Sequence, residues 1–166
     1  MALVDQGKLT LDDPVEKYLP EFKDMKVKGG KSPIHRMTIR HLLSHTAGFW
    51  GNKGISAEKL DLIRNLPRPL GEAVSRMATY ELEYQPGTKF VYSGSGFCVA
   101  GRIAEVVLNQ SLERIAQEVL FHPLGLSRTT YLPSKEIRMT VLTAYSRQSG
   151  GVLERQPSRT GGDLRF

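Results

Sequence analysis

The chain has 166 residues, 40% of them hydrophobic, and a formal net charge of +6. This length supports one compact domain over residues 1–166 and leaves little room for a second. No run of 18 apolar residues occurs, which argues against a membrane-spanning helix, and residues 1–13 lack the basic, apolar and small-residue pattern of a secretory signal. As written, the sequence predicts a cytoplasmic chain with no membrane partner.

The first predicted helix is short. It begins directly after Asp12 and Asp13, whose carboxylates suit the positive end of a helix, and ends near Pro20. A loop rich in glycine and lysine follows. Thr38 can then cap a second helix, which we expect to continue until Gly48 offers a left-handed stop.

The loop between these helices belongs to the most basic stretch of the chain, residues 22–41. An acidic partner such as a nucleic acid would suit such a stretch. However, Glu21 and Asp24 interrupt the charges, and aromatic residues do not alternate with them as on a surface that binds single strands. We therefore predict a solvated loop and no nucleic-acid partner. The charges concerned are those of Lys23, Lys26, Lys28, Lys31, Arg36 and Arg40.

Two further helices are predicted between residues 56 and 83. Ser56 can cap the first of them, and the second follows a proline-rich turn. Apolar residues recur in both at the spacing of one helix face. The buried positions are expected at Leu60, Ile63 and Leu66 in the first helix and at Leu70, Ala73, Val74 and Met77 in the second.

An extended run ends at Tyr92 and turns through small residues into another helix. Ser111 can cap the next helix, which Pro123 ends. From residue 139 onward two extended runs flank a Gly-Gly pair, which is typical of a β-hairpin. The domain thus divides into a helical part, residues 1–135, and a hairpin part, residues 136–166. The helix after Tyr92 is expected to bury Phe97, Ala100, Ile103, Ala104 and Val107.

The lone cysteine, Cys98, lies in the apolar stretch FCVAGRIAEVV of that helix. A single cysteine cannot form an intrachain disulfide. Its surroundings indicate a small buried hydrophobe, and a reactive thiol is the alternative.

The chain contains, in this order, VDQGKLTLDDPVEKYLPEF, TIRHLLSHTAGF, QPGTKFVYSGSGF and FHPLGLSRTTY. Together these stretches resemble the serine β-lactamase and DD-peptidase-like family, above all its class C and esterase-type members. The resemblance spans almost the whole chain. It implies a mainly α fold, namely the helical subdomain of that family's α+β fold with a small C-terminal β-hairpin. It also implies that the central sheet, which the family builds from both termini, is largely missing.

The resemblance assigns a role to Tyr92. In the family the serine of an S-x-x-K motif attacks a carbonyl, its lysine and a tyrosine move the proton, and a late K-T-G or H-x-G strand binds the substrate. Tyr92 takes the place of that tyrosine, within the loop Tyr92-Ser93-Gly94. Gly94 stands where the family usually has asparagine, although some members read YSGGGY. A phenol, with a reference pKa of about 10, serves as a proton relay only beside a cation, so Tyr92 needs a lysine partner. The alternative is a half-buried aromatic packed under the loop.

This sequence differs from the family pattern in the position of its S-x-x-K motif and in the lack of a late K-T-G. There the S-x-x-K motif precedes the segment that resembles residues 2–9, and the K-T-G follows the one that resembles residues 161–166. The sequence therefore predicts a β-lactamase-related serine hydrolase fragment that is inactive alone and uses no cofactor. The S-x-x-K that does occur, Ser56 to Lys59, lies much closer to Tyr92 than in the family, and Ser56 is already explained as an N-cap. A minimal esterase that uses Ser56 or Ser93 with Lys59 and Tyr92 is the alternative.

His41 and His45 stand four residues apart, the spacing of two zinc ligands on one helix. Leu42 follows where the H-E-x-x-H motif has glutamate, so we predict no metal site. The resemblance makes this block architectural, with its histidine hydrogen-bonded to a turn. Ser44 and Thr46 fit the same role.

The missing sheet suggests a further possibility, a non-catalytic interaction module. Helix faces that no sheet covers leave apolar surface exposed, and large apolar patches are usually covered by association. We therefore expect a homo-oligomer. Members of the family are often periplasmic or secreted. Whether the substrate is a lactam, a peptide or an ester is decided by family residues outside this sequence.

Overall fold

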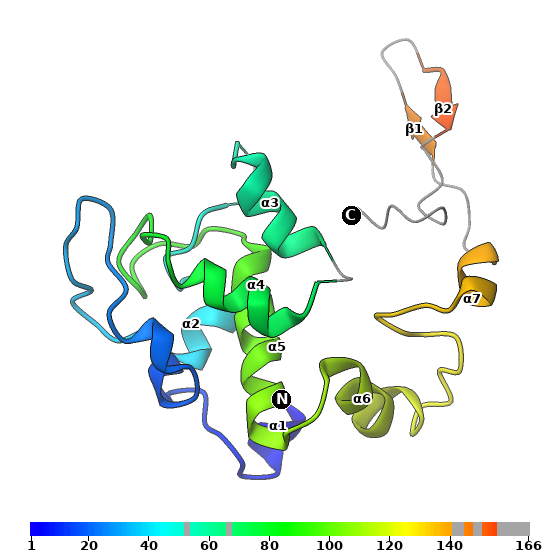
Figure 1. The fold of residues 1–166 in the computed structure, drawn as a ribbon, viewed down its shortest axis with the longest axis horizontal. Coiled ribbons are helices and arrows are strands. Elements are labelled where there is room, and N and C mark those ends of the chain that lie inside the picture. The colour runs from blue at the N-terminus through cyan, green and yellow to red at the C-terminus, as the bar shows by residue number, and fades with distance from the viewer. Residues whose placement is uncertain (52–53, 66–67, 141–144, 148–150, 156–166) are drawn as a thin grey trace.

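The computed structural model describes residues 1–51, 54–65, 68–140, 145–147 and 151–155. Within these ranges the protein is mainly helical, with a single two-stranded sheet (Figure 1). Short η turns precede α2, and η3, a π-helical stretch, continues α6. The elements are α1 (Ala2–Asp5), η1 (Val15–Lys17), η2 (Pro20–Phe22), α2 (Ile39–Leu43), α3 (Ala57–Arg64), α4 (Leu70–Met77), α5 (Gly94–Leu108), α6 (Leu112–Ala116), η3 (Gln117–Phe121), α7 (Lys135–Met139), β1 (Tyr145–Arg147) and β2 (Leu153–Arg155).

Helix α5 is the centre of the fold. It contacts α2, α3, α4 and α6, and Figure 1 shows it running through the middle of these elements. Its inner face buries Val99 and Ile103, as the apolar spacing of this helix requires. Gly96 allows a close approach to α2, because a Cβ atom there would lie 2.7 Å from the carbonyl oxygen of Leu42.

The core lies between α5 and the segments that precede it. Burying apolar side chains there supplies the main stabilising free energy of the fold. Helix α4 buries Ala73, Val74 and Met77 as predicted, and Cys98 packs against the edge of the core. Burial raises the pKa of the Cys98 thiol to about 11, so the thiol is not activated.

The predicted helix after Asp13 is replaced by the turns η1 and η2. The Asp13 carboxylate accepts hydrogen bonds from the Thr10 backbone N–H at 2.8 Å and from the Tyr18 hydroxyl at 2.6 Å. The backbone of this segment also pairs across the fold, since the Val15 N–H donates to the Met37 carbonyl. Pro20 ends the first turn, because the residue before a proline avoids the helical conformation, and Leu19 accordingly has φ −129° and ψ 84°.

Two other predictions were partly wrong. Helix α3 begins at the Ser56 cap as expected, but its most buried side chain is that of Leu62, while Leu60 and Ile63 are partly buried. Leu66 lies outside the described residues. Helix α5 forms as predicted, and Ile103 is buried, but Ala100, Ala104 and Val107 are only partly buried and Phe97 is 51% exposed.

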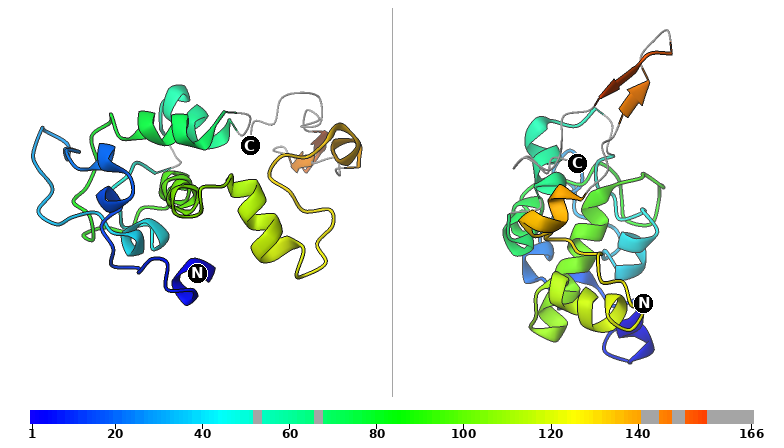
Figure 2. Two further views of the ribbon diagram at one scale, coloured as in Figure 1. Left: turned by 60° about the horizontal axis from the view of Figure 1, so that its bottom comes forward. Right: turned by 90° about the vertical axis from the view of Figure 1, so that its right-hand side faces the viewer.

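The C-terminal hairpin is confirmed. Strands β1 and β2 pair antiparallel, with Tyr145 opposite Arg155. In Figures 1 and 2, α7 and this hairpin stand away from the helices around α5. No helix in the described ranges combines the length and apolar character needed to cross a membrane.

Candidate functional site

Tyr92 lies directly before α5, at the point where an extended segment turns into the helix. Ser93 is the N-cap of α5, and its Oγ accepts a hydrogen bond from the Ser95 N–H at 3.2 Å. Ser93 is buried, whereas the Tyr92 side chain is 64% exposed. The tyrosine ring therefore projects from the loop and does not pack beneath it.

The extended segment before Tyr92 is held against residues 45–48. The Gly87 N–H donates to the Thr46 carbonyl at 2.8 Å, and the Tyr84 N–H donates to the Gly48 carbonyl at 3.3 Å. Gly48 has φ 90°, and a Cβ atom there would collide with the Tyr84 carbonyl oxygen. The glycine that the sequence suggested as a helix stop thus allows two backbone segments to approach each other.

Helix α2 ends at Leu43, earlier than predicted. Ser44 is its C-cap, and the next residue, His45, adopts the left-handed conformation with φ 57°. This turn directs residues 46–50 along the segment that leads to Tyr92, which a helix continued to Gly48 could not do.

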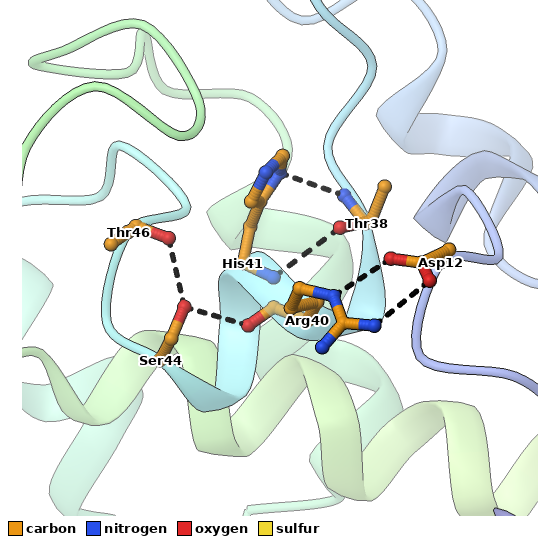
Figure 3. A network of polar contacts seen from close by, with 6 residues as sticks. All are labelled: Asp12, Thr38, Arg40, His41, Ser44 and Thr46. Atoms are coloured by element: carbon orange, nitrogen blue, oxygen red, sulfur yellow. Dashed lines mark hydrogen bonds and ion pairs between the residues drawn. The ribbon is translucent and has the colours of Figure 1, made fainter.

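A polar network fixes α2 and the turn after it (Figure 3). At the start of the helix, the Thr38 Oγ1 accepts from the His41 N–H at 3.3 Å, and the His41 Nδ1 accepts from the Thr38 N–H at 3.2 Å. Burial lowers the pKa of His41, which suits its role as an acceptor. At the end, the Ser44 Oγ donates to the Arg40 carbonyl at 2.8 Å and shares a hydrogen bond with the Thr46 Oγ1 at 2.9 Å. His41, Ser44 and Thr46 are therefore engaged in holding the backbone.

Arg40 joins this network to the N-terminal segment. Its guanidinium makes two hydrogen bonds of 2.8 Å to the Asp12 carboxylate (Figure 3). The pair lies on the surface, where such a bond contributes little to stability. The other basic side chains of residues 22–41 include Lys28 and Arg36, which form ion pairs with Glu83 and Glu16.

His45 contacts the loop that carries Tyr92. Its Nδ1 accepts from the Ser93 N–H at 3.3 Å, and its ring centroid lies 4.6 Å from that of Tyr92. The same ring lies 5.1 Å from Phe97 and 5.7 Å from Phe90. The sequence pointed to a histidine bonded to a turn, but it gave no sign that the turn belongs to Tyr92, 47 residues further on.

Ser56 and Lys59 have contacts of their own. The Ser56 Oγ caps α3 by accepting from the Lys59 N–H at 3.3 Å. The Lys59 ammonium lies 4.3 Å from the ring centroid of Trp50 and 3.9 Å from a carboxylate oxygen of Glu83. A cation against an aromatic face and a carboxylate is held in place. The structure thus brings Ser93 and Gly94 beside Tyr92 and gives Ser56 and Lys59 a separate set of partners.

Comparison with known proteins places this geometry in a family. The family model described as Beta-lactamase matches residues 1–163. A protein of Salmonella agona named as an inferred D-alanyl-D-alanine carboxypeptidase is 32% identical over 147 residues. That match covers 79% of this chain and 30% of the relative.

Solved structures share the fold. EstCE1, described as a hydrolase with promiscuous acyltransferase activity, has a TM-score of 0.76 and 27% identity, over 99% of this chain and 45% of that one. The octameric penicillin-binding protein homologue from Pyrococcus abyssi has a TM-score of 0.66 and 26% identity, over 95% of this chain and 35% of that one. The chain spans about 30% of the length of the curated relatives it matches.

Proposed function

Since the chain belongs to the beta-lactamase family, we propose that Tyr92 is the proton-relay residue of a serine hydrolase that transfers acyl groups. The observation that carries the proposal is the placement of Tyr92. An exposed phenol stands on a loop whose backbone is fixed by His45 and by the N-cap of α5.

The chemistry follows from the phenol and its surroundings. When a serine attacks an acyl carbonyl, its proton must leave, and the leaving group must later receive one. A phenol can carry that proton in both directions when positive charge lies near it. The amino end of α5 adds partial positive charge directly after Tyr92, through the turn of Ser93 and Gly94. In this proposal a lysine from the rest of the family fold supplies the full cation that the relay needs.

We propose substrates with an ester, peptide or lactam carbonyl. The relative named as a D-alanyl-D-alanine carboxypeptidase and the hydrolase EstCE1 both have names that imply acyl chemistry at a carbonyl. That two relatives with different named activities share this fold supports a common reaction type but favours none of the three substrates.

The nucleophile, in this proposal, is not supplied by residues 1–166. Ser56 is used as the cap of α3, and the Lys59 ammonium is held by Trp50 and Glu83. The described part of the chain corresponds in this view to the helical subdomain of the family fold, without its central sheet. The chain alone should then lack turnover.

Hydrolysis of nitrocefin and p-nitrophenyl acetate by the purified chain tests this proposal. We expect no turnover above buffer, and the same result for Tyr92→Phe and Ser56→Ala. Turnover that disappears in Ser56→Ala or Tyr92→Phe would contradict the claim that residues 1–166 lack the nucleophile, because the minimal esterase that uses Ser56, Lys59 and Tyr92 would then be correct.

A second candidate function is self-association through the region after α5. Several of its large apolar side chains face solvent. The side chain of Leu124 is 62% exposed and that of Leu132 is 57% exposed. A pocket of about 370 Å³ opens between α4, α5 and α6, lined in part by Leu70, Leu112 and Leu132. Apolar surface of this kind is usually covered by association, and the Pyrococcus abyssi homologue is described as octameric.

Sedimentation at micromolar concentration tests the association. We expect a dimer or larger species for the unchanged chain and a shift toward monomer for Leu124→Ser combined with Leu132→Ser. A clean monomer before substitution would contradict it.

A further inference from the structure

We propose that His45 is a positioning residue for Tyr92, which it holds through the backbone on both sides of the tyrosine and through its ring. The inference rests on the proposed function, because it assigns His45 a role at the same site. It goes further because it states which contacts keep the phenol in one place and which ring nitrogen of His45 must carry no proton.

Two hydrogen bonds from a single residue bracket Tyr92. The His45 carbonyl accepts from the Val91 N–H at 2.9 Å, and the His45 Nδ1 accepts from the Ser93 N–H at 3.3 Å. The residues directly before and after the tyrosine are thus tied to the same partner. Two anchors of this kind fix the position and the direction of the intervening residue.

The conformation of His45 supports the view that its side chain is needed. The residue adopts φ 57°, which costs free energy for any residue with a Cβ atom and which glycine would adopt freely. The chain nevertheless places a histidine there. Its own N–H donates to the Leu42 carbonyl at 3.4 Å, so the strained residue is also anchored at the end of α2. The contacts of the imidazole offset the cost of the conformation.

The imidazole also limits where the tyrosine ring can go. The two rings lie 4.6 Å apart at an interplanar angle of 42°, and Phe90 and Phe97 make edge contacts with the same imidazole. The three aromatic side chains are 51 to 65% exposed, so His45 is the shared contact among rings that otherwise face solvent. Loss of the imidazole would leave Tyr92 free to change rotamer.

The bond to Ser93 requires one tautomer of the neutral His45 imidazole. Nδ1 can accept a hydrogen bond only when it carries no proton, so the neutral ring must carry its proton on Nε2. Protonation of Nδ1 would turn the acceptor into a donor facing the Ser93 N–H and break the bond. A proton relay displaced by about 1 Å can lose a hundredfold in rate, so this bond matters to the proposed reaction.

The tautomer of His45 is the first test. Long-range proton–nitrogen NMR spectra of the neutral imidazole in the unchanged chain should show an unprotonated Nδ1 and a protonated Nε2. A protonated Nδ1 in the neutral ring would overturn the inference. This measurement needs no substitution and is independent of any folding defect in a variant.

A pair of variants separates the two contacts of the side chain. Asparagine tolerates the left-handed conformation, and its Oδ1 can accept from the Ser93 N–H, whereas phenylalanine keeps a ring and offers no acceptor. In His45→Phe the Ser93 amide should exchange with deuterium about tenfold faster, because one hydrogen bond is lost. In His45→Asn the rate should stay within about threefold of the unchanged chain. The Ile103 amide, inside α5, reports whether each variant remains folded.

Equal Ser93 exchange in the unchanged chain and in a folded His45→Phe variant would overturn the inference. Neither test involves turnover. A negative result here therefore does not decide the proposed function, which the hydrolysis assay tests. In the same way, an unexpected result in the hydrolysis assay does not decide whether His45 bonds to Ser93.

Discussion

Residues 1–108 and residues 109–155 are stabilised in different ways. Within the described ranges, every buried apolar side chain except those of Ile115 and Phe121 belongs to the first region. Among its described residues the second region exposes many large apolar side chains, namely those of Leu120, Leu124, Leu126, Tyr131, Leu132, Tyr145, Val152 and Leu153. In the left-hand view of Figure 2, α7 and the hairpin lie away from the helices around α5.

The contrast explains where the candidate site lies. A packed core restricts the elements that rest on it, and Tyr92 stands at the end of the helix that this core surrounds. In the second region, order depends more on polar contacts such as those of Glu113. The candidate site thus lies on the region that can hold a side chain in place, while the other region leaves apolar side chains exposed.

The largest expected effect comes from opening a cavity in the first region. Leu42 is fully buried, so Leu42→Ala should lower the free energy of unfolding by about 2–5 kcal/mol. Leu124→Ala, at a side chain that is 62% exposed, should change it by less than about 0.5 kcal/mol. Urea unfolding measures both. Similar losses in the two variants would show that the regions are packed alike.

The contact between α5 and α2 should also be sensitive to added volume. A Cβ atom at Gly96 would lie 2.7 Å from a backbone oxygen of Leu42, so Gly96→Ala should destabilise by about 1–3 kcal/mol. Gly101 in the same helix would meet only the side-chain ends of Leu112 and Leu70, at 3.0 and 3.2 Å, which can move. Gly101→Ala should therefore be close to neutral, since alanine favours the helix by about 1 kcal/mol. Thermal unfolding compares the two, and a Gly101→Ala variant that loses more stability than Gly96→Ala would contradict the packing described.

A substitution at Glu113 should remove hydrogen bonds that stabilise the second region. Its carboxylate accepts from the Gln117 side chain and the Thr130 hydroxyl at 2.8 Å, and from the Tyr131 N–H at 2.6 Å. Glu113→Gln leaves only one acceptor oxygen, so the opening of the 129–132 segment should become easier by about 1–2 kcal/mol. Hydrogen exchange at the Tyr131 amide measures this. An unchanged exchange rate would show that other contacts hold the segment.

Acid should weaken the same segment. Burial acts to raise the pKa of Glu113, but the hydrogen bonds from Gln117, Thr130, Tyr131 and Leu132 outweigh it, and the pKa lies below its usual value. A carboxyl with a lowered pKa stabilises the fold above its unfolded value of about 4.3, and this contribution is lost as the pH falls through the folded value. The protection of the Tyr131 amide, which is the slowing of its exchange relative to that of an unstructured peptide at the same pH, should therefore fall below about pH 4 in the unchanged chain. Glu113→Gln should lack this acid step, and a step that persists in it would point to another carboxyl.

Much of the fold could be predicted because the decisive signals are local. Thr38, Ser56 and Ser111 cap helices as expected, since a hydroxyl before an apolar periodic stretch leaves few other arrangements. The Gly-Gly pair between two extended runs also identified the hairpin correctly. The turns at η1 and η2 were not predictable, because Asp13 is bonded to Tyr18 and its segment pairs with residues near Met37.

The candidate site shows the same limit. The family resemblance pointed to Tyr92 and its turn, and the block around His45 was expected to support a turn. That His45 bonds to Ser93 depends on its left-handed backbone and on a contact across 48 positions of the chain. Neither feature can be recognised in a single sequence, because a histidine after a helix is compatible with many structural roles.

The most direct test of the claim that residues 1–166 do not supply the nucleophile is covalent labelling. The chain would be incubated with a fluorophosphonate and with benzylpenicillin, and its intact mass measured, beside a serine esterase that is known to react. If the nucleophile is not among residues 1–166, no adduct should form on this chain while the control is labelled. An adduct on Ser56 or Ser93 that vanishes in Ser56→Ala or Ser93→Ala would contradict the proposal and show a complete acyl-transfer site within these residues.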